Sequence, residues 1–348
     1  MDFRAPPPSP VASARRFSHQ NDDVFGHLLE TSFRVPNLNL ANKHQQRPPP
    51  KVDFLTLCSD DSLRQVVLDS FATVGCFQLL NHGIPPDFIS SPTEAAVGVF
   101  RVQPEKRAAV TRSPENPCGF DAEESELSEE FVWVRNNDFN QKMEQIWPTG
   151  YSNFRKKMDT LMSRIEKVAE KILPMIFKDS PKNIANSIDM IRGHELGTLC
   201  CVYKHAGPDN MSGPWANSLK YDVIRMLIGG TDYSHSLCLH VCDGSSEFHV
   251  YSKKGWLSFF PEKGALVITV GDQTQISSDG HYKHVIGRPI FKGEKEDRIS
   301  MAFHYSPPNN KNTFQTSRER TISVGFQAIL ALILTILYHV LIYIIRKF

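Results

Sequence analysis

The sequence predicts a mainly β protein with helices, plus one C-terminal transmembrane helix. Short apolar runs alternate with turn signals between residues 195 and 306, a spacing typical of a sandwich, a jelly roll or a barrel. Residues 91–180 have mainly helical patterning, and residues 322–345 contain no charged side chain.

Composition limits the classes of function. The chain has 348 residues, 41% of them apolar, with 39 Lys and Arg against 38 Asp and Glu, a formal charge of +1. It can therefore bury a large core, and we expect no nucleic-acid partner held by bulk electrostatics. The length permits two domains or one large β domain. Seven cysteines without C-x-x-C pairs favour free thiols in a reducing compartment.

Residues 1–50 are rich in Pro, Ser, Asn and Gln, and we expect a flexible segment with one short helix over Asp22 to Arg34. The first 20 residues contain no apolar core of a secretory signal, although a transit peptide stays an alternative. Residues 51–90 then predict strand, helix and strand. Asp60 or Ser59 caps the helix, and a buried strand over Cys76 to Leu80 ends at a turn.

Apolar residues recur on one face from Tyr151 to Ile176, which predicts a long amphipathic helix covering a sheet. The β-rich part follows. Its predicted strands are 199–203, 237–241, 248–251, 257–260, 265–270, 282–286 and 299–305.

Four ordered segments resemble the plant-type 2-oxoglutarate/Fe(II)-dependent dioxygenases, the isopenicillin N synthase-like superfamily. They are Val74–Pro85 (VGCFQLLNHGIP), Gly255–Asp272, Ser278–Val285 (SDGHYKHV) and Arg298–Phe303 (RISMAF). The resemblance spans about residues 50–308. It implies a double-stranded β-helix, a form of jelly roll, with an N-terminal helical wrap.

The resemblance divides the chain into regions. It implies an N-terminal dioxygenase-like region of strands and helices over 51–195 and a double-stranded β-helix core over 196–308. Residues 309–321 read as a linker to a transmembrane helix over 322–345.

The resemblance also implies an iron site of two histidines and one carboxylate, from an H-x-D pair and a distal His. Alternate strand residues point the same way, so an H-x-D pair reaches one metal. Here the matching residues are Gly230, Thr231 and Asp232, and the distal position is Gly287. Only Asp232 carries a ligand atom. We therefore expect Fe(II) binding to be impaired.

Four nearby histidines are candidate replacements: His235, His240, His281 and His284. The first and last lie three residues from Asp232 and Gly287, so strand alternation turns them to the opposite face. The other two have the right parity but lie further along the chain, and a bulge would change the parity. Cys238, His240 and Cys242 form a C-x-H-x-C pattern, for which we favour core packing over a zinc-type site.

The 2-oxoglutarate end resembles the family more closely. The resemblance assigns Arg298 to the distal carboxylate, with Ser300 and Tyr203 as further contacts, and a guanidinium suits a carboxylate well. The alternative interpretation is that Arg298 only forms a surface salt bridge, since Glu296 and Asp297 are next to it.

Residues Ile322 to Ile345 run for 24 residues without a charge, about 36 Å of helix against a hydrocarbon core of about 30 Å. We expect a single-pass tail anchor in the endoplasmic reticulum or mitochondrial outer membrane, with residues 1–321 in the cytosol. A buried or dimerising helix is the alternative.

The favoured hypothesis is a membrane-anchored, catalytically impaired family member with a ligand-binding or scaffolding role, binding 2-oxoglutarate or another small molecule. An active 2-oxoglutarate-dependent oxidoreductase with an atypical iron site is the alternative. A metal-independent carrier of a small ligand is a third hypothesis.

Overall fold

The computed structural model describes residues 48–113, 116–121, 128–177, 197–205, 233–242, 244–252, 255–291 and 298–307. All belong to one compact unit, residues 1–308. The predicted helix over 22–34, the positions Gly230 and Asp232, and the predicted span over 322–345 lie outside these residues. Within the described ranges, no helix is long and apolar enough to cross a membrane.

The N-terminal elements match the expected strand, helix and strand. They are β1 (Lys51–Asp53), α2 (Phe54–Leu57), α3 (Asp61–Thr73) and β2 (Cys76–Leu80). Asp60 caps α3, because its Oδ1 accepts a hydrogen bond of 2.8 Å from the backbone N–H of Ser62. The turn after β2 uses Asn81 and Gly83 at positive φ.

The next region contains helices, as expected, and two strands that were not expected. The helical elements are α4 (Asp87–Ala96), η1 (Val99–Arg101), α5 (Pro104–Arg107), η2 (Ala108–Val110), α6 (Asn137–Ile146) and α7 (Tyr151–Phe177). The strands β3 (Gly119–Phe120) and β4 (Ser128–Val134) correct the mainly helical prediction. The run Phe131 to Val134 is fully buried, so it shows none of the alternation that marks a half-exposed strand.

The C-terminal elements are β5 (Leu199–His205), β6 (Leu237–Val241), β7 (Glu247–Ser252), β8 (Gly255–Phe259), β9 (Leu266–Val270), α10 (Asp272–Ser277), β10 (Ile286–Ile290) and β11 (Arg298–Tyr305). Six of the seven predicted strands are confirmed. The strand predicted at 282–286 instead begins at Ile286. The residues before it are bound to other elements, since Lys283 N–H donates to Phe71 O at 3.0 Å and His284 N–H donates to Gln275 Oε1 at 2.7 Å.

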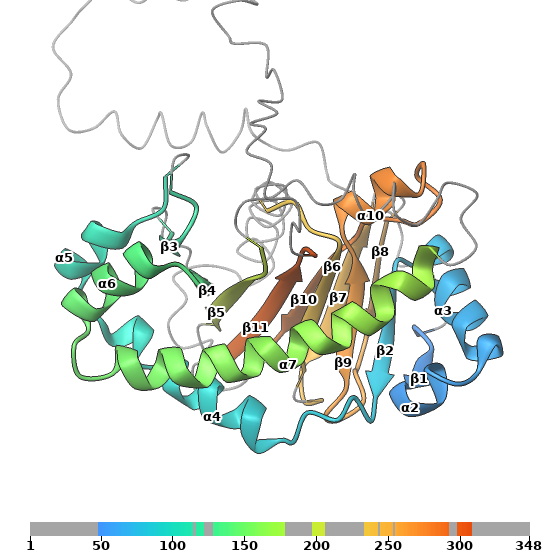
Figure 1. Cartoon of the computed structure of the whole chain (residues 1–348), viewed down its shortest axis with the longest axis horizontal. Coiled ribbons are helices and arrows are strands. Elements are labelled where there is room, and N and C mark those ends of the chain that lie inside the picture. The colour runs from blue at the N-terminus through green and yellow to red at the C-terminus, as the bar shows by residue number, and fades with distance from the viewer. Residues whose placement is uncertain are drawn as a thin grey trace, which may run out of the picture. The chain divides into compact units, whose positions relative to one another are not determined.

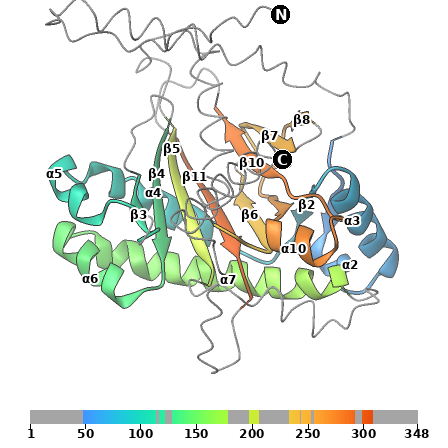
Figure 2. The same cartoon turned by 90° about the horizontal axis from the view of Figure 1, so that it is seen from above.

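The strands form two sheets. The larger has the order β1-β2-β9-β6-β11-β5-β4-β3, and the smaller has the order β10-β7-β8. Among the strands of the described residues, β1 and β2 pair in parallel, and the remaining strand pairs are antiparallel. The helix α7 lies across the large sheet, and the small sheet lies on the other side of that sheet (Figures 1 and 2). This is the layered arrangement of a jelly roll.

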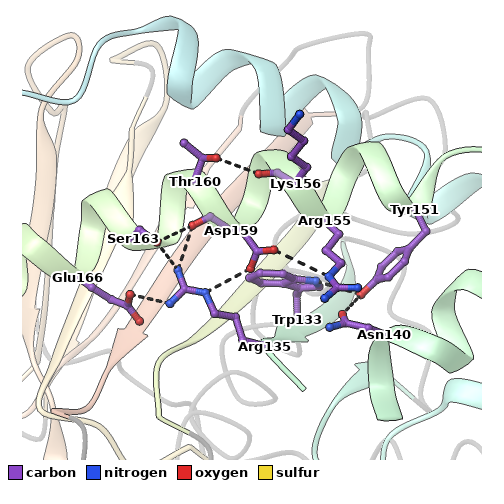
Figure 3. Close-up of polar contacts among 10 residues, drawn as sticks. All are labelled: Trp133, Arg135, Asn140, Tyr151, Arg155, Lys156, Asp159, Thr160, Ser163 and Glu166. Atoms are coloured by element: carbon purple, nitrogen blue, oxygen red, sulfur yellow. Dashed lines mark hydrogen bonds and ion pairs between the residues drawn. The ribbon is translucent and has the colours of Figure 1, made fainter. Parts of the chain in front are cut away.

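The helix α7 is fixed to the large sheet by apolar and polar contacts. Its buried face includes Phe154, Leu161 and Ile165. Trp133 Nε1–H on β4 donates to Tyr151 Oη at 3.2 Å, and Tyr151 Oη–H donates to Asn140 Oδ1 at 2.5 Å (Figure 3). These paired polar groups help to set the position of α7.

At the end of β4, Arg135 makes a second set of contacts with α7. Its guanidinium binds Glu166 Oε2 at 2.7 Å, Ser163 Oγ at 2.8 Å and the Asp159 backbone oxygen at 3.0 Å (Figure 3). The helix that was predicted from periodicity alone is thus confirmed as the cover of one sheet face.

A smaller core lies between the two sheets. Its members are Cys76, Cys242, Phe248, Val250, Leu257, Phe259, Val267 and Val285, which come from both sheets. The side chains of β6 and β11 that share this side are more polar, and they form the candidate site.

Candidate functional site between the sheets

The two faces of β11 differ in chemistry. Met301, Phe303 and Tyr305 alternate with Ser300, Ala302 and His304. In the antiparallel register, His304 lies opposite Cys238 of β6, and Ala302 lies opposite His240. The His240 ring contacts Phe248 of β7 with 5.0 Å between ring centroids. The face that carries His304, Cys238 and His240 is therefore the one between the sheets.

Gly287, which the sequence predicts to match the family's distal iron ligand, is surrounded by other side chains. A Cβ added there would meet two ring atoms of Phe248 at 2.7 Å and His240 Nε2 at 3.1 Å. An imidazole would need still more room than a Cβ. A side chain at Gly287 would therefore require the Phe248 ring to shift, and the glycine itself offers no ligand atom to a metal ion.

His240 occupies part of that space. Its Nε2 lies 3.3 Å from Thr269 Oγ1 on β9, and burial together with nearby His235 lowers the pKa of His240 to about 3. The imidazole is neutral at physiological pH and keeps a lone pair for a donor or a metal.

His235, Cys238 and His304 converge at the end of β6. One ligand atom from each lies within 4.8 Å of the others. The rings of His235 and His304 have centroids 4.3 Å apart, and the His284 ring is 5.9 Å from that of His235. Burial holds the pKa of His304 well below its usual value, and the neighbouring His235, His240 and His284 act in the same direction. Three imidazoles thus lie beside the thiol of Cys238, and His235, Cys238 and His304 are buried.

The segment before β6 is held by α10. Asp272 Oδ1 accepts from the His235 backbone N–H at 2.8 Å, and Asp272 Oδ2 accepts from Ser234 Oγ at 2.6 Å. Ser236 Oγ–H donates to Gln273 Oε1 at 2.8 Å. Because residues 233–236 are not in a strand, simple alternation does not apply to them. His235 and Cys238 therefore reach the same cluster although they are three residues apart.

The predicted 2-oxoglutarate residues lie at the other end of β5 and β11. Tyr203 is the cross-strand partner of Ser300, and His205 that of Arg298. Ser300 is buried and its Oγ lies 2.7 Å from His205 Nε2. Arg298 is exposed. The structure thus brings Ser300 and Tyr203 together and places the Arg298 side chain toward solvent.

A second arginine lies at this end. Arg288 is buried, and its guanidinium carbon is 5.5 Å from the centroid of the Tyr203 ring. Burial, and then the charge of Arg288, hold the pKa of His205 well below its usual value. Burial raises the pKa of Tyr203 well above its usual value, so its hydroxyl stays protonated. A buried cation, a phenol and a buried hydroxyl form a group suited to an anionic ligand.

The sequence did not indicate His205, Arg288 or His304 as site residues. His205 follows the altered segment Cys201–Lys204, and Arg288 follows Gly287, so both adjoin residues that were considered. The signal for His304 was its parity with Ser300 on one strand. That His304 lies opposite Cys238 follows only from the register of β6 and β11.

Two family models match the chain. The non-haem dioxygenase in morphine synthesis N-terminal model matches residues 50–155, and the 2OG-Fe(II) oxygenase superfamily model matches residues 199–307. Together they cover the segments on which the resemblance was drawn.

Two curated relatives from plants are similar to this chain. The chain is similar to 1-aminocyclopropane-1-carboxylate oxidase 4 of Solanum lycopersicum, with 23% identity over 266 residues, 75% of this chain and 80% of that protein. It is also similar to flavanone 3-dioxygenase 2 of Oryza sativa subsp. japonica, with 25% identity over 304 residues, 83% of this chain and 82% of that protein.

Solved structures share the fold. JOX2 in complex with 2OG, Fe and JA matches with a TM-score of 0.57 and 18% identity over 78% of each chain. The dioxygenase for auxin oxidation 1 of Arabidopsis thaliana, bound to 2-oxoglutarate, matches with a TM-score of 0.55 and 16% identity, covering 76% of this chain and 95% of that one. The predicted jelly roll with helices is confirmed.

Proposed function

We propose that this chain, which belongs to the 2OG-Fe(II) oxygenase superfamily, is a catalytically impaired member that binds a small anionic ligand. The family uses 2-oxoglutarate and Fe(II). One observation carries the proposal: the space beside Gly287 is filled by Phe248 and His240. A binding or scaffolding role follows, because the fold persists while the family's distal iron ligand has neither a donor atom nor room.

Iron binding tests the proposal. The full-length chain in detergent is titrated anaerobically with Fe(II), with and without 2-oxoglutarate. We expect no 2-oxoglutarate-dependent binding and no formation of succinate. If the wild-type chain binds Fe(II) in a 2-oxoglutarate-dependent way, or forms succinate, the proposal is rejected.

A restored variant provides the positive control. Gly230→His with Gly287→His supplies the missing imidazoles, but the second substitution meets the Phe248 ring at 2.7 Å. Phe248→Val must therefore be added. The triple variant should bind Fe(II), whereas Phe248→Val alone should not. This comparison distinguishes the effect of the new histidines from the effect of the added space.

The ligand is proposed to bind at Tyr203 and Ser300, as a carboxylate-bearing small molecule such as 2-oxoglutarate. Two arginines offer a matched test, because Arg298 has the family's position while Arg288 is buried over Tyr203. We expect 2-oxoglutarate affinity, measured by calorimetry, to fall in Arg298→Gln if the family's contact is used. A loss confined to Arg288→Gln would move the carboxylate contact to the buried guanidinium. Unchanged binding in both variants would remove this site.

One observation favours the second candidate, an active oxidoreductase with an atypical iron site. A histidine does enter the space of the missing distal ligand, since His240 Nε2 lies 3.1 Å from the Cβ position of Gly287. Such an enzyme would convert 2-oxoglutarate to succinate in the wild-type chain and lose this turnover in His240→Phe. His281→Phe, at an exposed histidine, is the matched control.

The proposal includes membrane attachment through residues 322–345, whose 24 uncharged positions suit one transmembrane helix. The seven cysteines fit a cytosolic location of the folded part. A fluorescent protein fused to residues 309–348 should label a membrane of the endoplasmic reticulum or of mitochondria. Diffuse cytosolic fluorescence would reject the anchor.

A further inference from the structure

We propose that His235, Cys238 and His304 bind a divalent zinc-type cation between the two sheets. The site uses none of the three positions that correspond to the family's iron ligands. It therefore goes beyond the proposed function and does not depend on it.

The donor set is the first argument. Two imidazoles and one thiolate are ligands that zinc prefers, and three protein ligands leave one position for water or a small ligand. Cys238 and His304 lie directly opposite each other on neighbouring strands, so both side chains leave the sheet on the same side. His235 completes the group from the segment before β6, with its ring 4.3 Å from that of His304.

The distances need only a small adjustment. Tetrahedral ligands at zinc bond lengths of about 2.0–2.3 Å lie roughly 3.3–3.8 Å apart. One ligand atom from each of the three residues already lies within 4.8 Å of the others. Side-chain rotation closes a gap of this size, with the strands left in place.

His304 supplies an independent observation. It is only 9% exposed, and its Nδ1 is buried without a hydrogen-bond partner, although a hydrogen bond links the residue to the Tyr233 backbone. Buried polar atoms in native proteins are rarely left without a partner. In the proposed site this nitrogen is the ligand atom of His304, and the metal ion would satisfy it.

The surroundings of His235 resemble those of a metal-binding histidine. Such residues usually direct their second ring nitrogen to a carbonyl or carboxylate, which fixes the ring. His235 Nδ1 lies 2.7 Å from the Tyr233 carbonyl oxygen and 3.9 Å from Asp272 Oδ1. Behind it, Gly271 leaves no room for a side chain, since an added Cβ would be 2.0 Å from the His235 oxygen. The ring is thus held from two sides.

The binding step balances simply. The divalent cation accepts a lone pair from each imidazole and displaces the thiol proton of Cys238, which passes to solvent. No redox partner is needed.

Cobalt(II) is the probe, because its thiolate complexes absorb in the near ultraviolet and its tetrahedral complexes absorb strongly in the visible. The metal-stripped full-length chain in detergent is titrated with Co²⁺ under reducing, anaerobic conditions, and Zn²⁺ is then added. We expect one equivalent of Co²⁺ to produce both bands and Zn²⁺ to abolish them. No thiolate-to-cobalt band in the wild-type chain would overturn the proposal.

Substitutions test which cysteine supplies the thiolate that binds the metal. Cys238→Ser should lose the near-ultraviolet band and at least about tenfold in affinity, and His304→Gln should weaken binding similarly. Cys242→Ser is the matched control, because Cys242 is also buried and lies on the same side of the sheet. A band retained in Cys238→Ser, or lost equally in Cys242→Ser, would reject the assignment.

A measurement without substitution covers the case in which Cys238→Ser does not fold. Zn²⁺ should slow alkylation of Cys238 in the wild-type chain, followed by mass spectrometry, and leave Cys200 unaffected. Equal rates at Cys238 with and without Zn²⁺ would count against the site. Neither assay uses iron or 2-oxoglutarate, so its result is separate from the test of the proposed function.

Discussion

The two faces of the large sheet differ in the chemistry of the side chains that they bury. The face under α7 is built from large apolar side chains whose few polar groups are mutually hydrogen-bonded, as with Trp133, Tyr151 and Asn140. The face toward the small sheet carries buried histidines, cysteines and a hydroxyl, and His304 retains an unpaired nitrogen. The first arrangement supplies stability. The second keeps polar groups away from water at a cost that a binding function would explain.

The largest expected effect compares two aromatic residues, Phe154 of α7 and Phe248 of β7, which lie on opposite sides of the large sheet. Phe154 and Phe248 are both fully buried, but Phe154 is surrounded by rings of Phe131, Trp133 and Tyr151. Phe154→Ala should lower the unfolding free energy by about 3–5 kcal/mol, because its cavity stays dry. Phe248→Ala should cost at least about 1 kcal/mol less, since a cavity beside His240 can hold water. Urea denaturation measures both, and equal costs would contradict the contrast.

The next effect concerns the support of the inter-sheet cluster. Gly271→Ala places a methyl group 2.0 Å from the His235 oxygen and should destabilise the chain by about 1–3 kcal/mol. Gly264→Ala is the control, because it adds left-handed strain at φ +74 in open space and should cost about 1–2 kcal/mol. Only Gly271→Ala should also weaken Co²⁺ binding. Unchanged Co²⁺ binding in that variant would show that His235 is not positioned by the glycine.

Acid should weaken the histidine-rich regions first. Burial lowers the folded-state pKa of His82 and His205 below the unfolded value of about 6.5. Each therefore contributes stability that is complete above that pH and is lost as the pH falls below it toward the folded pKa. Each residue adds a slope of up to about 1.4 kcal/mol per pH unit. Urea midpoints between pH 7.5 and 5 should fall, less steeply in the variant with His82→Asn and His205→Asn. A flat wild-type profile would refute this account.

The smallest effect is expected at Arg135, on the helix side. Its side chain is 35% exposed, and partly solvated ion pairs contribute little even in a network with Asp159 and Glu166. Arg135→Met should therefore cost about 1 kcal/mol or less in urea denaturation. A cost of about 3 kcal/mol would mean that the polar contacts, and not the apolar face, hold α7 in place.

Local patterns predicted most elements of the fold. Periodicity placed α7 to within one residue at its end, and short apolar runs located β6 and β11. These patterns gave wrong predictions for a strand that is buried on both sides, as in β4. They also failed where buried apolar residues belong to a loop. Tyr282 and Val285 are buried, but they lie before β10 and not in it. A run of apolar residues indicates that a segment is buried, but burial alone does not show that the segment is a strand.

The site was predicted only in part. The motifs identified Gly287, but its filling by Phe248 depends on how β7 and β10 pair. The pairing of Cys238 with His304 joins residues 66 positions apart in the sequence, and no local pattern carries that information. The exposure of Arg298 also follows from its place at the start of β11 and not from its motif. The span over 322–345 and the role of Asp232 remain predictions.

The Phe248 ring beside Gly287 has a consequence for substitutions at the two positions. Introducing a histidine at Gly287 in one mutational step would force an imidazole against an aromatic ring. Shrinking Phe248 first would open a cavity in the core before any ligand appears. Both orders pass through a less stable intermediate, so the two positions are epistatic. A histidine at position 287 and a smaller side chain at position 248 are therefore coupled changes, each of which depends on the other.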